Sequence, residues 1–154
     1  MKRIMWLVLG CTLSIAGLVT ATATDQAAAI KQDRSLYRGS WRAVFLQVDG
    51  KIAADQDTKK LTVINRPEGL WSLLSDGKEI SAGTSEIDPT KMPKTIDFVP
   101  TTGNDKGKLY LGIYALEGDH RKLCFAGPGK PRPLEFASKP GSGVILVAFE
   151  REKK

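Results

Sequence analysis

Tight-turn dipeptides divide this chain into short segments, and they constrain its fold more than any other feature. Asp49-Gly50, Asp76-Gly77 and Gly118-Asp119 are pairs that commonly close β-hairpins, because glycine readily adopts the positive φ that these turns need. The segments between the turns are short, and several alternate between apolar and polar residues, as half-buried strands do. The sequence therefore predicts an antiparallel β protein whose consecutive strands pair.

Eight extended segments can be recognised between the turns. They span residues 39–48, 60–65, 69–75, 78–88, 94–100, 108–117, 120–126 and 143–151. We expect a short additional strand at 134–136 and one or two helical turns within 52–59. Outside the N-terminal segment, no long helix is predicted.

A run of eight antiparallel strands can close on itself into an up-and-down β-barrel. Closure removes the exposed strand edges that would otherwise invite aggregation, although two packed sheets would produce much the same sequence pattern. The chain of 154 residues suits a single domain. We therefore predict one all-β domain over residues 36–152, a single antiparallel up-and-down β-barrel of about eight strands.

The first 23 residues have the pattern of a secretory signal peptide. Met1-Lys2-Arg3 is basic, residues 4–19 are largely apolar, and Ala21-Thr22-Ala23 supplies the small residues of a cleavage site. A membrane span needs about 20 predominantly apolar residues, and this run is shorter. We expect export to the periplasm or beyond, residues 24–35 as a spacer, and no transmembrane span in the mature protein.

The cysteines leave one alternative to this processing. Val8-Leu9-Gly10-Cys11 resembles a lipoprotein cleavage site, at which Cys11 would be acylated and anchor the protein to a membrane. Cleavage after Ala23 instead leaves Cys124, which has no cysteine to pair with inside the mature chain. Because Cys124 lies in an apolar run, we expect it to be a small buried residue.

Charge and residue types exclude several kinds of function. The net charge is +6, and +4 without Lys2 and Arg3, with no basic stripe interleaved with aromatic residues. One histidine, His120, and Cys124 cannot build an ordinary zinc site, which takes three or four ligands. No phosphate-binding loop or nucleophile elbow is present. We expect no nucleic-acid partner, no catalytic residues, no metal, no cofactor and no enzymatic activity.

Several motifs resemble a known family of barrel proteins. Gly39-Ser40-Trp41 resembles the Gly-x-Trp signature of lipocalin-type barrels. The most specific stretches are Pro128-Gly129-Lys130-Pro131-Arg132-Pro133 and Ser138-Lys139-Pro140-Gly141-Ser142-Gly143. From Leu36 to Arg151 the chain is similar to the lipocalin-like domain family of uncharacterised exported planctomycete proteins, and it departs from that family at His120-Arg121.

The resemblance implies a calycin-type β-barrel and a means of closing it. In such barrels a tryptophan plugs the closed end and a basic residue of the last strand lies across it. Here Trp41 and Arg151 would take these parts, and a guanidinium over an indole contributes up to about 2 kcal/mol when desolvated. The family's own function is unknown, so the resemblance implies no ligand-binding residues.

The barrel interior is the place where we expect a ligand to bind. Strict alternation from Trp41 places Ala43, Phe45 and Gln47 inside. The predicted ligand-binding residues are Phe45, Leu73, Phe98, Tyr114, Phe125 and Val147. A filled core without a cavity remains the alternative structure.

Two functions remain open at this point. The first is an exported lipocalin-like protein that binds a small apolar or amphipathic ligand in its barrel. The alternative is a non-enzymatic protein-interaction or inhibitor module that binds an envelope protein through the loop from Gly127 to Gly143.

Overall fold

The computed structural model describes residues 19–153. Residues 1–18, with most of the predicted signal peptide and Cys11, lie outside the described part. In chain order the elements are α1 (Val19–Tyr37), β1 (Gly39–Val48), β2 (Lys51–Ile52), α2 (Asp55–Thr58), β3 (Leu61–Asn65), the 3₁₀ turn η1 (Pro67–Gly69), β4 (Leu70–Ser75), β5 (Lys78–Asp88), β6 (Thr95–Pro100), β7 (Tyr110–Glu117), β8 (His120–Ala126) and β9 (Val144–Arg151).

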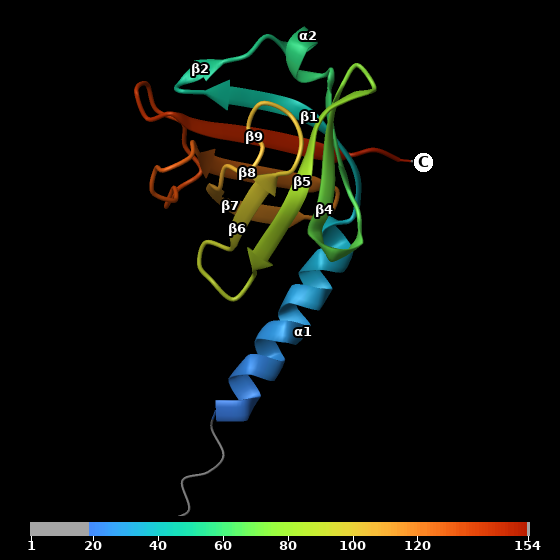
Figure 1. The fold of residues 1–154 in the computed structure, drawn as a ribbon, viewed down its shortest axis with the longest axis vertical. Coiled ribbons are helices and arrows are strands. Elements are labelled where there is room, and N and C mark those ends of the chain that lie inside the picture. The colour runs from blue at the N-terminus through green and yellow to red at the C-terminus, as the bar shows by residue number, and fades with distance from the viewer. Residues whose placement is uncertain (1–18, 154) are drawn as a thin grey trace, which may run out of the picture.

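The strands form a closed antiparallel barrel. Strands β1 and β3 to β9 pair in chain order, and β9 returns to pair with β1, so that eight strands close on themselves (Figure 1). The short strand β2 pairs with the end of β1. The prediction of an up-and-down barrel is confirmed, and the two-sheet alternative is wrong. Residues 134–136 do not form the additional strand that we expected.

The hairpin dipeptides adopt the backbone that the sequence predicts. Asp49 and Gly50 have φ of 50° and 80°, and Asp76 and Gly77 have φ of 50° and 76°. Two consecutive positive φ values match the twist of the flanking strands, which is why such pairs close tight hairpins. These turns fix which strands become neighbours.

A β-bulge in β1 changes which side chains face the interior. Against β9, Ala43 pairs with Phe149 but Phe45 pairs with Ala148, so Val44 is an extra residue. An extra residue reverses the alternation beyond it. Leu46 and Val48 therefore line the interior, whereas Phe45 and Gln47 do not, and the prediction that these two point inward is wrong.

Helix α1 occupies the segment that we expect to be a spacer. Residues 24–35 lie within it, and half of them are three alanines, two glutamines and one lysine, which are good helix formers. Its C-terminal part contacts the barrel: Gln26 donates a hydrogen bond to Asp88 at 3.0 Å, and Asp33 and Tyr37 are buried in the last turns. The N-terminal end of the helix extends away from the barrel (Figure 1). The prediction of no long helix fails because composition alone does not distinguish a small-residue linker from a helix docked at one end.

The loop from Gly127 to Gly143 lies against the outside of the barrel. Arg132 donates hydrogen bonds to the carbonyl oxygens of Ile96 and Gly112, at 3.1 and 2.6 Å. The Cys124 thiol, on the outer side of β8, donates to the Ala137 carbonyl at 3.7 Å and is fully buried. Burial raises the pKa of this thiol, so the loop both covers it and lowers its reactivity.

We expect Cys124 to resist alkylation while the protein is folded. In a Cys11→Ser variant, which leaves Cys124 as the remaining cysteine, iodoacetamide should react about 100-fold more slowly at pH 8 than in denaturing urea, because the loop must open first. Mass spectrometry of timed samples measures both rates. Equal rates would show that the loop does not cover the thiol in solution.

Candidate functional site

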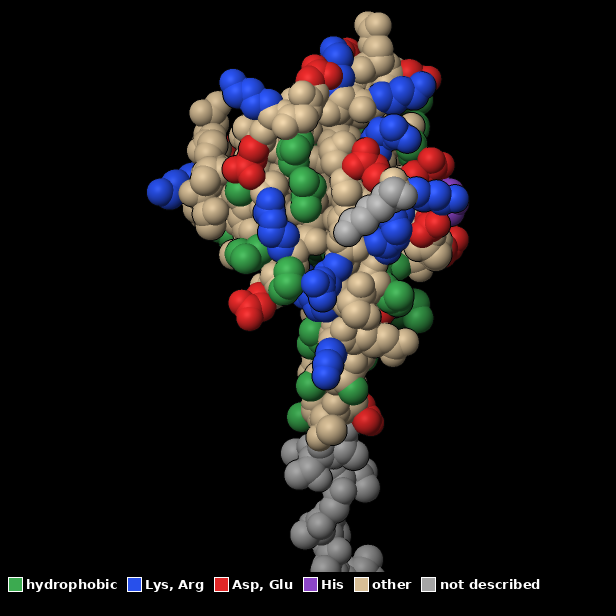
Figure 2. Space-filling model, turned by 90° about the vertical axis from the view of Figure 1, so that its right-hand side faces the viewer, with side chains coloured by type: hydrophobic (Ala, Val, Ile, Leu, Met, Phe, Trp, Pro, Cys, Tyr) green, Lys and Arg blue, Asp and Glu red, His purple; other side chains and the backbone are tan. Residues whose placement is uncertain are grey.

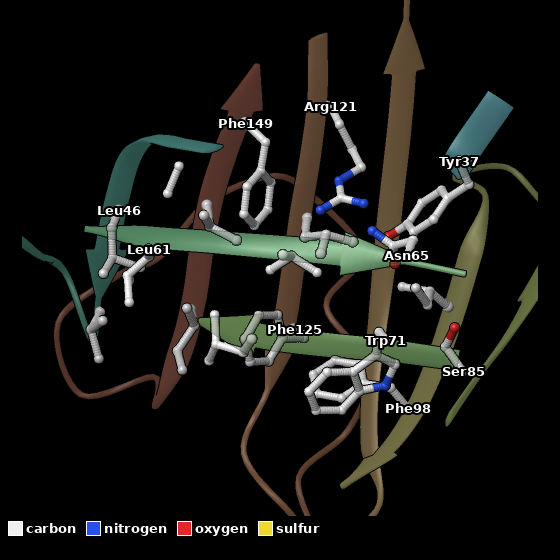
Figure 3. Close-up of a pocket in the computed structure, with 18 residues that line it drawn as sticks. Tyr37, Leu46, Leu61, Asn65, Trp71, Ser85, Phe98, Arg121, Phe125 and Phe149 are labelled. Carbon is white, nitrogen blue, oxygen red and sulfur yellow. The ribbon is translucent and has the colours of Figure 1, made fainter. Parts of the chain in front are cut away.

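The barrel encloses a cavity of about 290 Å³. The surface of the cavity is almost wholly apolar, and the polar or charged side chains among its lining residues are Tyr37, Asn65, Ser85 and Arg121 (Figure 3). Trp41, Arg121 and Phe149 lie toward the α1 end. Val48 lines the opposite end, where β1 pairs with Ile145, and Val48 is 42% exposed. The cavity is therefore closed at the helix end and open to solvent at the other.

Four of the six predicted ligand-binding residues line this cavity. They are Leu73, Phe98, Phe125 and Val147. Phe45 does not line it, because the bulge turns its side chain away from the interior. Tyr114 does not line it either, because it packs edge-on against Tyr37 at 5.6 Å, beneath the cavity at the closed end.

Aromatic rings hold one wall of the cavity in place. Phe98 stacks on Tyr110 with ring centroids 4.9 Å apart, and it meets Phe125 and Trp71 edge-on at 4.9 and 5.9 Å. Stacked and edge-on pairs are the favoured geometries for aromatic side chains. The Trp71 indole also donates a hydrogen bond to the Thr84 carbonyl, so this wall is preorganised.

Trp41 and Arg151 meet at the closed end of the barrel. The Trp41 side chain is fully buried, and its indole donates a hydrogen bond to the Tyr37 carbonyl at 2.9 Å. The Arg151 guanidinium lies 4.1 Å from the centre of the indole and donates to the carbonyls of Leu36 and Arg38, at 2.6 Å each. Arg151 thus satisfies carbonyls at the end of α1 and covers Trp41 at the same time.

The same contact explains the glycine of Gly39-Ser40-Trp41. Gly39 has φ of 113°, which L side chains rarely adopt, and a Cβ there would lie 2.9 Å from Nη1 of Arg151. Glycine is favoured at this position chiefly because of the positive φ, and a side chain there would also displace the Arg151 guanidinium.

Asp33 anchors α1 to the barrel wall. Its Oδ2 accepts hydrogen bonds from Nζ of Lys94 and from the Tyr114 hydroxyl, at 2.7 Å each. Burial, followed by the bond to Asp33, raises the pKa of Tyr114 far above its usual value, so the phenol stays a donor. Next to it, Arg34 donates to the hydroxyl and carbonyl oxygens of Ser85.

Arg121 is a buried cation beside the cavity. It is 1% exposed, and its guanidinium lies 4.6, 4.8 and 4.3 Å from the ring centres of Tyr37, Trp41 and Phe149. Within the described residues, Nε, Nη1 and Nη2 have no hydrogen-bond acceptor. Each cation–π contact contributes up to about 2 kcal/mol, whereas burying an ion costs several kcal/mol. Desolvation lowers the pKa of Arg121, but arginine remains charged in proteins.

The sequence reasoning did not identify Arg121 or Asn65 as cavity residues. The signal for Arg121 was present, because Arg121, Leu123 and Phe125 alternate along β8 and so share one face. Strand-end polar residues are usually solvated, and only the position of α1 over the barrel end buries this one.

A comparison of the chain with protein-family models, curated proteins and solved structures finds no match. Across residues 19–153, no helix is both long and apolar enough to cross a membrane. In the same range, no three acidic, histidine or cysteine side chains are grouped as they would be in a metal site.

Replacing Arg151 should destabilise the fold. Arg151→Met removes two charge-assisted hydrogen bonds and a cation–π contact, so we expect the free energy of unfolding to fall by about 2–4 kcal/mol. Urea denaturation measures the change, and Lys153→Met, at an exposed position two residues beyond the end of β9, is the control. A loss within about 0.5 kcal/mol, as for ordinary surface changes, would contradict this role.

Proposed function

We propose that this protein is a non-enzymatic, lipocalin-like carrier that binds a small apolar or amphipathic molecule inside its barrel. The observation that carries the proposal is the apolar cavity of about 290 Å³. Protein interiors are close-packed, and voids larger than a water molecule are few. Small-molecule sites of proteins begin at about 300 Å³, so the cavity suits a small ligand.

The form of the cavity supports the same function. Its aromatic wall is preorganised around Phe98, which lowers the cost of ordering side chains when a ligand binds. One end is sealed by α1, and the other opens beside Val48. A ligand would enter at the open end and lie along the barrel axis.

Export is part of the proposal. The basic, apolar and small-residue order of the first 23 residues supports secretion of the chain. An exported carrier would act in the periplasm or outside the cell. Figure 2 shows acidic and basic side chains interspersed over one face of the barrel, as on an ordinary solvated surface.

The loop from Gly127 to Gly143 supports the alternative function less well. Its specific polar residues bind the protein itself: Arg132 pairs with Asp97, and the Ser138 hydroxyl donates to the Val144 carbonyl at 2.6 Å while accepting from the Gly50 amide at 3.0 Å. These contacts explain the specific residues of the loop by a structural role, which is to cover the outer wall of the barrel.

Filling the cavity should abolish binding of an uncharged apolar probe. We expect N-phenyl-1-naphthylamine to bind the full chain with enhanced fluorescence, and Leu73→Trp to weaken its affinity at least about 10-fold, because the indole occupies the cavity. Leu70→Trp, on the same strand but at a position 45% exposed, should bind as the parent does. No uptake by the parent protein would overturn the proposed function.

A second experiment identifies the natural ligand. Native mass spectrometry of the protein purified from its own cells, before and after solvent extraction, should show excess mass that disappears on extraction. A protein whose mass is that of the bare chain in both samples would count against a tightly held ligand.

A further inference from the structure

The closed end of the cavity carries a positive charge with no acceptor. Arg121 lines the cavity, is 1% exposed, and has three nitrogen atoms without a hydrogen-bond partner among the described residues. The rings of Tyr37, Trp41 and Phe149 attract the charge but do not supply the lone pairs that its five N–H groups need. The aromatic contacts therefore leave its directional hydrogen-bonding capacity unused.

Two acidic groups near this end, Asp33 and Asp119, are paired with residues other than Arg121. Asp33 accepts hydrogen bonds from Lys94 and Tyr114, and Asp119 pairs with Nε of Arg151 at 3.2 Å. Arg151, whose charge is paired with Asp119, lies against the same indole as Arg121. Arg121 is therefore left without an acidic partner among the described residues, which favours an anion over a cation beside it.

A second unpartnered donor lies at the same end of the cavity. The side-chain nitrogen of Asn65 is buried and has no acceptor among the described residues, and Asn65 lines the cavity. Figure 3 shows Asn65, Arg121 and Tyr37 gathered at one end of the cavity, with Leu46 and Leu61 toward the other. An oxyanion between Arg121 and Asn65 would satisfy donors from two strands.

From this arrangement we infer that the ligand is an aliphatic carboxylate, with its head group on Arg121 and its tail along the apolar wall toward Val48. The inference rests on the proposed function, since it names the ligand class of the same cavity. The planar fork of a guanidinium matches the two oxygens of a carboxylate. Leu73, Phe98, Phe125 and Val147 then contact the tail.

The charge preference of the full-length protein tests the inference. Decanoic acid and decanol have the same tail, and each is titrated at pH 8 against bound N-phenyl-1-naphthylamine. We expect decanoate to bind about 10- to 100-fold more tightly than decanol, as loss of a charge-assisted hydrogen bond predicts. Since an uncharged alcohol leaves water more readily than a carboxylate, a preference for the acid can only come from the site.

Variants show which residue creates the preference. Arg121→Met should reduce the preference for decanoate, expressed as the dissociation constant of decanol divided by that of decanoate, to about one or below. Arg121→Lys should retain part of this preference because it retains the charge. Lys122→Met is the matched control, since it removes one positive charge from the adjacent, exposed position of the same strand. It should leave the ratio unchanged.

The outcomes separate this inference from the proposed function. If the naphthylamine probe and decanol bind and decanoate binds no more tightly, the carboxylate inference is overturned and the apolar carrier function stands. If no compound binds, both fail. If Arg121→Met does not fold, the ratio of decanol to decanoate dissociation constants is compared between the parent protein and Arg121→Lys. A ratio near one in the parent protein overturns the carboxylate inference by itself.

Discussion

The seal at one end of the barrel depends on the contact between Arg151, Trp41 and the last turn of α1. Arg151 covers the indole and binds the carbonyls of Leu36 and Arg38, while the indole binds the carbonyl of Tyr37. One side chain of the last strand thereby ties the helix to the first strand. Together with the bonds of Asp33 and Arg34 to the barrel wall, this contact holds α1 over the barrel end and keeps water from the groups beneath it.

The helix in turn determines the chemistry of the interior. With Tyr37 and Asp33 docked, water is excluded from the space around Arg121, which then lies among three rings with no described acceptor. An unpaired buried cation is costly, and proteins retain such groups mostly where they have a task. The apolar cavity directly beside this charge is the physical basis for proposing a carrier of amphipathic anions.

Local patterns predicted the strands well because hairpin strands are organised by nearest neighbours. The boundaries of β1, β5 and β8 agree with the sequence prediction, since turn residues and alternation act within a few residues. The same alternation failed at Phe45, because the bulge at Val44 is decided by how β1 twists against β9 across the closed barrel. Of the six predicted ligand-binding residues, four line the cavity, and Phe45 and Tyr114 do not.

The sequence by itself determined the class of fold: Asp-Gly turns and alternating apolar residues specify antiparallel neighbours, and eight such strands can close. It also contained the pair Trp41 and Arg151. Only the tertiary structure decided that residues 24–35 form a docked helix, that Val44 is bulged, and that Arg121 is buried rather than solvated. The reason is that all three features depend on contacts between residues that are far apart in the chain. Tyr37, Arg121 and Phe149 contact one another in the structure, and no local sequence pattern predicts these contacts.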